Sequence, residues 1–422
     1  MRTSTTKTEF SRFGSLLLAL GTILFLTGTL QAADEPKPGR SLDIAVNNTG
    51  VSFGNSPIFK GLRFNWRDHH VDRITGVNIT LWPARDNERA IVRGLSIGVL
   101  PEAGDLSGIN LGILGAGADR DLSGLNFGFV GLGGGRDVTG INIAGVGVGA
   151  GEELRGFTLG LVGVGAGRSL TGINLSGVAV GSGGDMSGLN VGLLAAGAGE
   201  SVVGINFGGL GIGAGRDLTG LNASFGGVGA GENLTGINVG GLGIGAGRSL
   251  TGLNATFVGI GAGENLTGIN LAGIGIGSGG DVTGINLAGI GIGAGHTLTG
   301  LNVAGIGVGS GNSIKGITVA GIGAGANEVT GFTVAGIGAG GNDIQGVTFA
   351  LGFIRVEDYH GEISGVLAST FNHVKGTQRG VSFGLLNMAR RLHGVQFGLI
   401  NYVADNPTLF KIMPLVNFSF KD

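Results

Sequence analysis

The chain of 422 residues contains no cysteine. It can therefore form no disulfide bond, no thiolate metal site and no lipid-modified N-terminal cysteine. Charged residues make up only 13% of the sequence, the formal net charge is −2, and no run of basic residues occurs. The positive patch that nucleic-acid-binding proteins carry is missing, so we expect no nucleic-acid partner.

Proline and the large aromatic residues are also scarce, with 7 Pro, 2 Trp and 2 Tyr. Glycine is abundant, at 95 residues, but it lacks the three-residue period of collagen. Disordered chains combine low hydrophobicity with high net charge, whereas 42% of this chain is hydrophobic. The composition therefore favours a folded chain with a buried core.

Only one long run of large apolar residues occurs, and it lies near the N-terminus. The run covers residues 15–30; basic residues precede it, and small residues follow it up to Ala33. The arrangement is typical of a secretory signal peptide over residues 1–33, cleaved after Ala32 or Ala33. An uncleaved membrane anchor is the alternative, although the run is shorter than the ~20 apolar residues of a membrane span. The sequence therefore predicts export.

Most of the remaining sequence is an internal repeat of 16 residues. A glycine, an apolar residue and then Asn or Thr open each unit, and fourteen units at constant spacing begin at positions from Gly108 to Gly316. A period this constant indicates an array of one small structural unit. The expected organisation is a linker with the start of an N-terminal cap (34–60), irregular N-terminal repeats (61–107), the regular array (108–345), and irregular C-terminal repeats with a cap (346–422).

The repeat unit, numbered from its opening glycine, predicts an all-β fold. Apolar residues occupy positions 2, 4, 7, 9 and 15, and turn-forming residues gather at positions 12 to 14. No 3.6-residue period is present, and this much glycine would destabilise a helix. We expect two short strands per unit, redirected by a glycine corner near position 5 or 6, and a thin core formed by the five apolar positions.

Two β architectures fit this unit: a β-solenoid of 16-residue coils, and an antiparallel β-meander or outer-membrane β-barrel. The constant spacing favours the solenoid, because one extra residue would break every ladder of a coil, whereas hairpin loops tolerate insertions. Asn occupies position 3 in twelve of the fourteen units, and stacked amides can hydrogen-bond along such a column. The aromatic girdles of membrane barrels are missing from the array. We therefore predict a glycine-rich β-solenoid with irregular caps.

Two further positions alternate between neighbouring units. Position 13 alternates between Arg and Glu over much of the array, which predicts attraction between adjacent coils. Position 6 alternates between a large residue and glycine, which suggests interdigitating core layers but is compatible with either architecture. The large residues at position 6 are Phe129, Leu161, Leu193, Phe225 and Phe257.

The two ends of the repeat region are irregular. Trp66 and Trp82 lie in the N-terminal repeats, where we expect them to cover the open end of the core rather than to form a binding site. At the other end stand Gly380-Val-Ser-Phe-Gly-Leu-Leu-Asn387, Gly394-Val-Gln-Phe-Gly-Leu-Ile-Asn401 and Met413-Pro-Leu-Val-Asn-Phe-Ser-Phe420. This C-terminal segment resembles an uncharacterised family of bacterial surface-repeat proteins built from G-V-Q-x-G-L-x-N units. The resemblance implies a cell-surface or outer-membrane location and brings no activity or functional residue with it.

Few residues suggest chemistry. His69 and His70, with Asp68 and Asp72 beside them, are the nearest approach to a metal cluster. Adjacent residues of a strand point apart, so a solvated loop is favoured over a metal site. Gly183-Gly184-Asp185 and Gly279-Gly280-Asp281 are similar to a calcium-binding β-roll motif but lack its nine-residue period. No trio of nucleophile, base and orienting group can be assigned by spacing. The sequence therefore predicts no catalytic, cofactor-binding or metal site, and not an enzyme.

The functional expectation is an exported structural or adhesive protein whose partners are cell-surface or envelope components. One alternative is an outer-membrane β-barrel or pore. Another is a secreted ice- or polymer-binding rod, for which the polar Asn column could serve as the binding surface.

Overall fold

The computed structural model describes residues 40–420; the predicted signal peptide over 1–33 lies outside the described residues. The chain divides into two compact units, Met1–Ser224 and Phe225–Asp422. In both units the described elements are β-strands, and a single 3₁₀ turn, η1 (Thr408–Phe410), interrupts them near the C-terminus. No helix within residues 40–420 has the length and hydrophobicity needed to cross a membrane.

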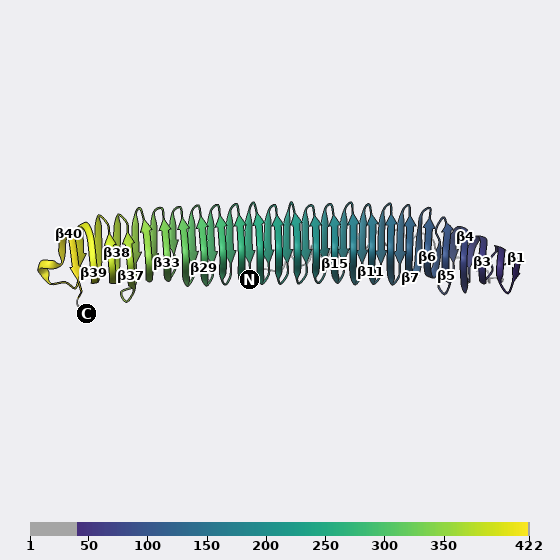
Figure 1. Cartoon of the computed structure of the whole chain (residues 1–422), viewed down its shortest axis with the longest axis horizontal. Helices are drawn as coiled ribbons and strands as arrows, with labels where there is room; N and C mark the ends of the chain where they lie inside the picture. Colours follow the sequence, from purple (N-terminus) through teal and green to yellow (C-terminus); the bar gives the residue numbers. More distant parts are fainter. Residues whose placement is uncertain (1–39, 421–422) are drawn as a thin grey trace, which may run out of the picture. The chain divides into compact units, whose positions relative to one another are not determined.

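The first unit begins with longer, irregular strands and continues with one long and one short strand per coil (Figure 1). The irregular strands are β1 (Ser41–Val46), β2 (Thr49–Gly54), β3 (Ile58–His69), β4 (Arg73–Arg85), β5 (Ile91–Gly98), β6 (Glu102–Gly112) and β7 (Gly115–Gly128). The long strands that follow are β9 (Asp137–Ala144), β11 (Glu153–Gly160), β13 (Ser169–Ser176), β15 (Asp185–Gly192), β17 (Val202–Gly208) and β19 (Leu218–Ser224). The short strands are β8 (Gly131–Gly134), β10 (Gly147–Ala150), β12 (Gly163–Ala166), β14 (Ala179–Ser182), β16 (Ala195–Ala198) and β18 (Gly211–Ala214).

The second unit repeats this alternation and becomes irregular toward its end. Its short strands are β20 (Gly227–Ala230), β22 (Gly243–Ala246), β24 (Gly259–Ala262), β26 (Gly275–Ser278), β28 (Gly291–Ala294), β30 (Gly307–Ser310), β32 (Gly323–Gly325), β34 (Gly338–Gly341) and β36 (Phe353–Val356). Its long strands are β21 (Leu234–Gly240), β23 (Ser249–Thr256), β25 (Asn265–Ala272), β27 (Val282–Ala288), β29 (Thr297–Ala304), β31 (Ser313–Ala320), β33 (Glu328–Ala335) and β35 (Asp343–Ala350). The last strands are β37 (Glu362–Ala368), β38 (Phe371–Phe383), β39 (Leu386–Val403) and β40 (Ile412–Ser419).

Neighbouring coils pair in parallel, with equal repeat positions opposite each other. Strands β11 and β13 align Gly156 with Gly172, and strands β23 and β25 align Asn254 with Asn270. Short strands do the same, as in the pairing of β10 with β12. Antiparallel pairs occur at the first two and the last two described strands, β1 with β2 and β39 with β40. The predicted all-β solenoid of 16-residue coils is confirmed, and the antiparallel meander and barrel alternatives are wrong.

The core is formed by a different set of positions from the one predicted. Positions 9 and 15 are buried as expected, for example Val164 (3% exposed) and Leu170 (0%). The prediction that positions 2, 4 and 7 lie inside is wrong, because their side chains are exposed or half-buried, as at Ile141 (45% exposed) and Val146 (41%). Side chains alternate along a strand, and in the long strands positions 3 and 5 face inward, so that Asn and small residues line the core together with the alanines of position 11.

The alternation at position 6 also has a different meaning from the one predicted. The large residues there do not interdigitate in the core, because Phe129 is 73% exposed and Phe257 is 83% exposed. They lie at the corner between the long and the short strand, and their side chains project outward. The period of 32 residues is therefore a feature of the outer surface.

The opening glycine of each unit is required by the backbone and by the stacking. Gly172 has a φ of 118°, which side-chain-bearing residues rarely adopt. A Cβ atom at Gly172 would also lie 2.1 Å from the carbonyl oxygen of Gly156 in the preceding coil. The glycine at position 8 of the preceding coil differs, since a Cβ at Gly163 would meet no atom within 4 Å.

The Asn column forms the predicted amide ladder, and it is buried. In the first unit Asn174 Nδ2 donates to Asn190 Oδ1 at 2.9 Å, and Asn190 Nδ2 donates to Asn206 Oδ1 at 2.9 Å. All three residues are 0% exposed. Thr158 interrupts the ladder: Asn142 Nδ2 still donates to Thr158 Oγ1 at 3.4 Å, but Asn174 Oδ1 on the other side lacks a donor. Asn at position 3 therefore provides a polar core whose groups are paired between coils.

The two tryptophans do not cover the open end of the core. Trp66 is 67% exposed and Trp82 is 47% exposed, and their rings stack on each other with centroids 6.3 Å apart. The expectation of cap packing is therefore wrong: the indoles form a surface pair because both project outward from neighbouring parallel strands, β3 and β4.

The glycine geometry leads to a matched pair of predictions. We expect Gly172→Ala to destabilise the protein by at least about 2 kcal/mol, because it combines an unfavourable φ with a clash against a backbone carbonyl. Gly163→Ala should be neutral or stabilising by up to about 1 kcal/mol, because alanine restricts the unfolded chain and meets open space. Urea unfolding of both variants checks this; equal losses would contradict the assignment of positions 1 and 8.

The amide ladder leads to a second prediction. Asn190→Ala removes two buried hydrogen bonds and leaves Asn174 Nδ2 and Asn206 Oδ1 without partners, so it should cost about 2–5 kcal/mol. Asn190→Thr should cost clearly less, because the hydroxyl keeps one of the two bonds, as Thr158 does. Thermal and urea unfolding of the two variants measure the difference, and the reverse order would argue against a ladder that stabilises the coils.

Candidate functional site: an apolar outer face and a histidine cluster

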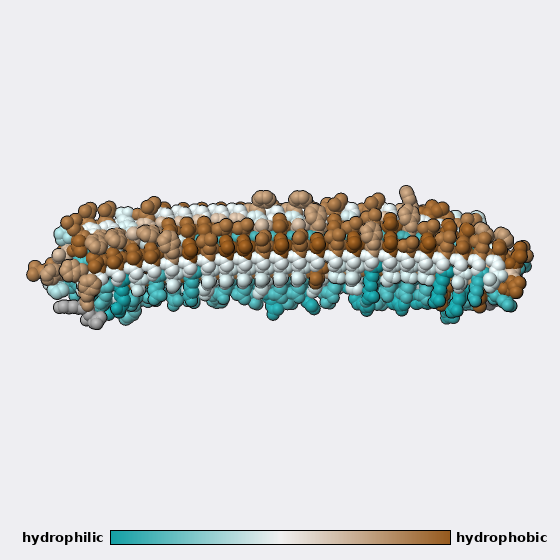
Figure 2. Space-filling model, viewed as in Figure 1, coloured by the Kyte–Doolittle hydropathy of each residue, from teal (hydrophilic) through white to brown (hydrophobic). Residues whose placement is uncertain are grey.

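An extended apolar surface lies on the outside of the coils. We name it the apolar face and define it as the side chains of positions 2, 4, 6 and 7 of the regular repeats. Figure 2 shows it in both units as a band of brown hydrophobic residues beside a pale row and a teal polar band. Its exposed members in the first unit include Ile109, Leu111, Ile113, Leu114, Leu125, Phe127, Phe129, Ile141, Val146, Leu161, Val162, Ile173, Leu193, Leu194, Ile205 and Leu210. Those in the second unit include Ile237, Val239, Leu242, Leu253, Phe257, Ile269, Leu271, Ile274, Ile285, Leu287, Ile290, Ile306, Ile317 and Ile322.

The apolar face is large for the surface of a single chain. Positions 2 to 7 span about 17 Å of backbone, and coils stack about 4.8 Å apart, so each coil contributes roughly 80 Å². The seven complete regular coils of the first unit therefore present about 550 Å², which is at the upper end of the largest apolar patches on ordinary monomers. Scattered surface hydrophobes do not explain an area of this size and regularity.

Polar columns flank the apolar face. Position 16, directly before the opening glycine of the next unit, carries threonine in successive coils of the second unit. These exposed residues include Thr235, Thr251, Thr267 and Thr283. At the far turn, position 13 forms ion pairs between neighbouring coils, with Arg168 Nη1 3.1 Å from Glu152 Oε2 and Arg216 Nη1 3.5 Å from Glu200 Oε2. The predicted attraction between alternating charges is confirmed. These exposed pairs add little stability, and they give the turns a mixed, nearly neutral charge.

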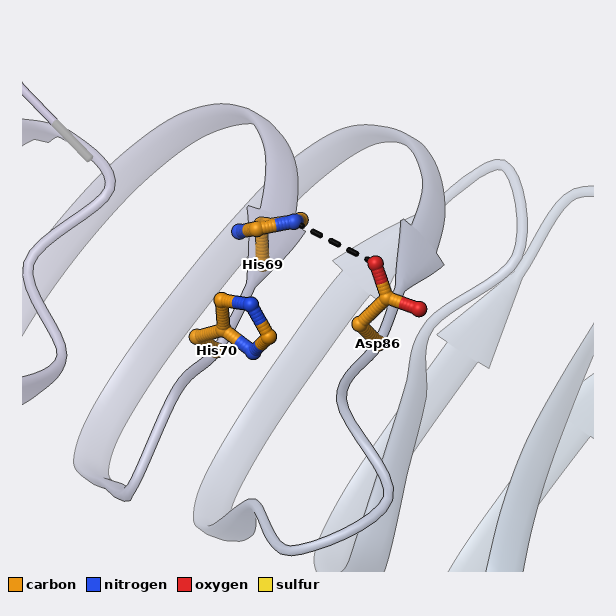
Figure 3. Close-up of side chains that lie close together, drawn as sticks. All are labelled: His69, His70 and Asp86. Carbon is orange, nitrogen blue, oxygen red and sulfur yellow. Dashed lines mark ion pairs between the residues drawn. The ribbon is translucent and has the colours of Figure 1, made fainter. Parts of the chain in front are cut away.

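The second candidate site lies in the irregular N-terminal coils, where two histidines and an aspartate converge (Figure 3). One ligand atom from each of His69, His70 and Asp86 lies within 4.8 Å of the other two. His69 Nε2 is 3.4 Å from Asp86 Oδ2, and the imidazole centroids of His69 and His70 are 4.0 Å apart. The expectation that these histidines point apart is therefore wrong.

The backbone explains why the three side chains meet. His70 and Asp86 follow the ends of strands β3 and β4 and lie sixteen residues apart, so coil stacking brings them together, and His70 N donates to Asp86 O at 3.3 Å. Both residues have a positive φ, 47° at His70 and 49° at Asp86. This conformation ends the strand alternation that would send neighbouring side chains to opposite sides.

A buried polar network holds the backbone beneath this cluster. Asn55 accepts a hydrogen bond from His69 N at 3.1 Å and donates to His69 O at 2.5 Å. Asn55 Oδ1 in turn accepts from Arg63 Nη2 at 2.9 Å, and Arg63 is fully buried, with Nη1 2.5 Å from Asp68 Oδ1. Asn78 also donates to Asp68, at 2.8 Å. The position of His69 therefore depends on a paired charge in the core.

The other aspartates considered in the sequence do not join this cluster. Asp68 belongs to the buried network with Arg63, and the backbone N–H of Asp72 donates to Pro57 O at 2.9 Å. The two aspartates of the glycine-rich motifs accept backbone hydrogen bonds from the next coil: Asp185 from Ser201 N at 3.1 Å and Asp281 from Thr297 N at 3.0 Å. In the structure both carboxylates therefore connect neighbouring coils, Asp185 from the first residue of β15 and Asp281 from the residue before β27.

Sequence reasoning missed Asp86 and Arg63. Asp86 could have been found from the repeat, because it lies one coil after His70, but the irregular spacing of the N-terminal units hides this register. Arg63 gave no signal, since a lone arginine in an apolar strand is read as solvated. Its burial becomes visible only when Asp68 and Asn78 are placed around it.

No protein family, no curated protein and no solved structure matches this chain.

An acidic residue near the N-terminal coils leads to a prediction about pH. Burial raises the pKa of Glu102 to about 7, and the nearby Asp119 carboxylate acts in the same direction. The folded state binds this proton more tightly than the unfolded state, so the contribution of Glu102 is fully present below about pH 4.5 and is lost as pH rises toward 7. Glu102→Gln should remove this decline, while Glu232→Gln, at an exposed ion-paired site, should not. Urea unfolding at pH 5 and pH 8 measures the free energy of unfolding of both variants. If Glu102→Gln loses as much stability between these pH values as the unmodified chain, the raised pKa of Glu102 is contradicted.

Proposed function

We propose that this chain is an exported structural or adhesive protein and that its apolar face joins it to a second copy of itself. The single observation behind the proposal is the apolar face, a regular outer surface of Ile, Leu, Val and Phe repeated along both units. No catalytic step is part of the proposal.

The size of the apolar face fits an interface between copies. One unit provides about 550 Å², so pairing with the same face of another copy buries roughly 1,100 Å² in total, which exceeds the minimum of about 1,000 Å² for a biological interface. β-sheets packed face to face interdigitate their side chains at a spacing of about 10 Å. Because every row repeats at the coil spacing, the apolar rows of a second copy have the matching period along the whole contact.

The charges around the apolar face agree with a partner that presents an uncharged, apolar surface. The turn charges at position 13 already pair within the chain, as Arg168 does with Glu152. The face itself contains no charged residue among positions 2, 4, 6 and 7 of the coils from Gly108 to Gly300. Association through it is therefore driven by the removal of apolar surface from water.

Export is supported by residues 1–33, whose pattern is that of a secretory signal peptide. The C-terminal resemblance to bacterial surface-repeat proteins supports a location at the cell surface, the outer membrane or the periplasm. Detection of the native chain in the cytoplasm with its first 33 residues intact would refute this part of the proposal.

A secreted ice- or polymer-binding rod is the second candidate function. The Asn column cannot serve as a binding surface because it is buried. The exposed threonine column of the second unit, from Thr235 to Thr283, supplies outward hydroxyl groups in its place.

Charge placed on the apolar face should separate the copies. We expect the purified mature chain to sediment as a dimer or larger assembly, because an apolar surface of this size and regularity is typical of an interaction site. The triple variant Ile141→Lys, Ile173→Lys and Ile205→Lys should weaken association at least tenfold in analytical ultracentrifugation. These three side chains are 41–52% exposed, so the coils should stay folded.

The matched control carries the same three charges on column 16, as Thr139→Lys, Thr171→Lys and Thr219→Lys, and should associate like the unmodified chain. A monomeric unmodified chain would refute self-association. If that monomer binds lipid vesicles and the triple Ile→Lys variant does not, the partner of the apolar face is a lipid surface and not a second copy. Thermal hysteresis that the threonine variant abolishes would instead support the rod alternative.

A further inference from the structure

We infer that His69, His70 and Asp86 form a binding site for a divalent transition-metal ion that links two neighbouring N-terminal coils. The inference is independent of the proposed function, since it concerns different residues and a different ligand. It rests on the geometry of the cluster, on the backbone that builds it and on the network beneath it.

The distances match a metal site. Zinc–nitrogen and zinc–oxygen bonds of about 2.0–2.1 Å place adjacent ligands of a tetrahedron about 3.3–3.4 Å apart. His69 Nε2 and Asp86 Oδ2 are separated by 3.4 Å, the length of one such edge. His70 offers its nearest nitrogen within 4.8 Å of both partners, and its exposed side chain can close the remaining distance by rotation about χ1 and χ2 (Figure 3).

The chemistry of the ligands selects the class of metal. Two imidazoles and one carboxylate suit Zn²⁺, Cu²⁺ or Ni²⁺, whereas Ca²⁺ and Mg²⁺ prefer sites made of oxygen ligands. Three protein ligands leave a position for water or for a side chain of another molecule. The ion would connect strand β3 to the turn after strand β4 and so stabilise coils that lack the regular Asn ladder.

The surroundings preorganise one ligand and leave two adjustable. His69 is partly buried, and its backbone is held on both sides by Asn55, which is anchored to the buried Arg63. Metal ligands commonly depend on such supporting contacts for their orientation. His70 and Asp86 are exposed and can adjust to the ion.

One positive charge competes for the site. Arg85 Nε lies 3.5 Å from Asp86 Oδ2, and both side chains are more than half exposed. An ion pair of this kind contributes little, so a divalent ion that binds two imidazoles in addition to the carboxylate displaces the guanidinium. An ion pair between protonated His69 and Asp86 is the competing explanation for the cluster, and the experiment has to separate the two.

Titration of tag-free full chain with Zn²⁺ at pH 7.5 in a calorimeter tests the inference. We expect one site, and affinity at least tenfold weaker in His70→Asn and in Asp86→Asn. Asparagine suits the positive φ of both positions, so neither change should disturb the fold. His296→Ala, which removes an isolated histidine of the regular array, should bind like the unmodified chain.

Two further measurements exclude a simple histidine–aspartate ion pair. The Co²⁺-loaded chain should show the intense visible absorption of four-coordinate cobalt, which His70→Asn removes. Lowering the pH from 7.5 to 5.5 should weaken Zn²⁺ binding at least tenfold, because protons compete for both imidazoles. Undetectable binding, or binding that the His70 and Asp86 variants leave unchanged, would overturn the site.

Discussion

Parallel hydrogen bonding between residues sixteen apart is the constraint on which the rest of this structure depends. The strands of each coil pair in register with the equal positions of the neighbouring coils, so a residue type that recurs in the repeat becomes a column. The constraint acts most strongly at the opening glycine, where the carbonyl of one coil occupies the space of a Cβ in the next. Columns of Asn, of aliphatic side chains and of alternating charge follow directly from this register.

The same constraint explains why so much apolar surface is outside. Each coil is thin, and its interior has room for two larger aliphatic side chains, two small ones and one amide, at positions 9, 15, 5, 11 and 3. The outward positions of the long strand still carry Ile, Leu and Phe. Because positions 2 and 4 carry an apolar residue in every regular coil, a single exposed side chain per coil adds up to an extended surface in each unit, and this surface is the basis of the proposed association.

The N-terminal coils depart from the regular pattern, and their polar chemistry is concentrated there. Arg63 occupies the column where the array has Asn, and its charge is paired inside the core with Asp68. A buried pair of this kind is expensive to desolvate unless its remaining groups are satisfied. Asn55 and Asn78 accept hydrogen bonds from the two terminal nitrogens of Arg63, while its Nε has no hydrogen-bond partner. The cluster of His69, His70 and Asp86 lies directly beside this network, at two residues whose backbone leaves the extended conformation.

The amino-acid sequence alone was enough to predict the period, the parallel stacking and the Asn ladder. The side chains of Asn174, Asn190 and Asn206 recur at a constant spacing, and they can hydrogen-bond to each other only if equal positions of successive coils lie in contact. The sequence was not enough to decide which side of the strand faces inward. Apolar residues occupy both sides, and the burial of Asn at position 3 depends on amides from the coils above and below. The meeting of His70 with Asp86 likewise required the three-dimensional structure, since it follows from a positive φ at each residue and from coil stacking across irregular spacing.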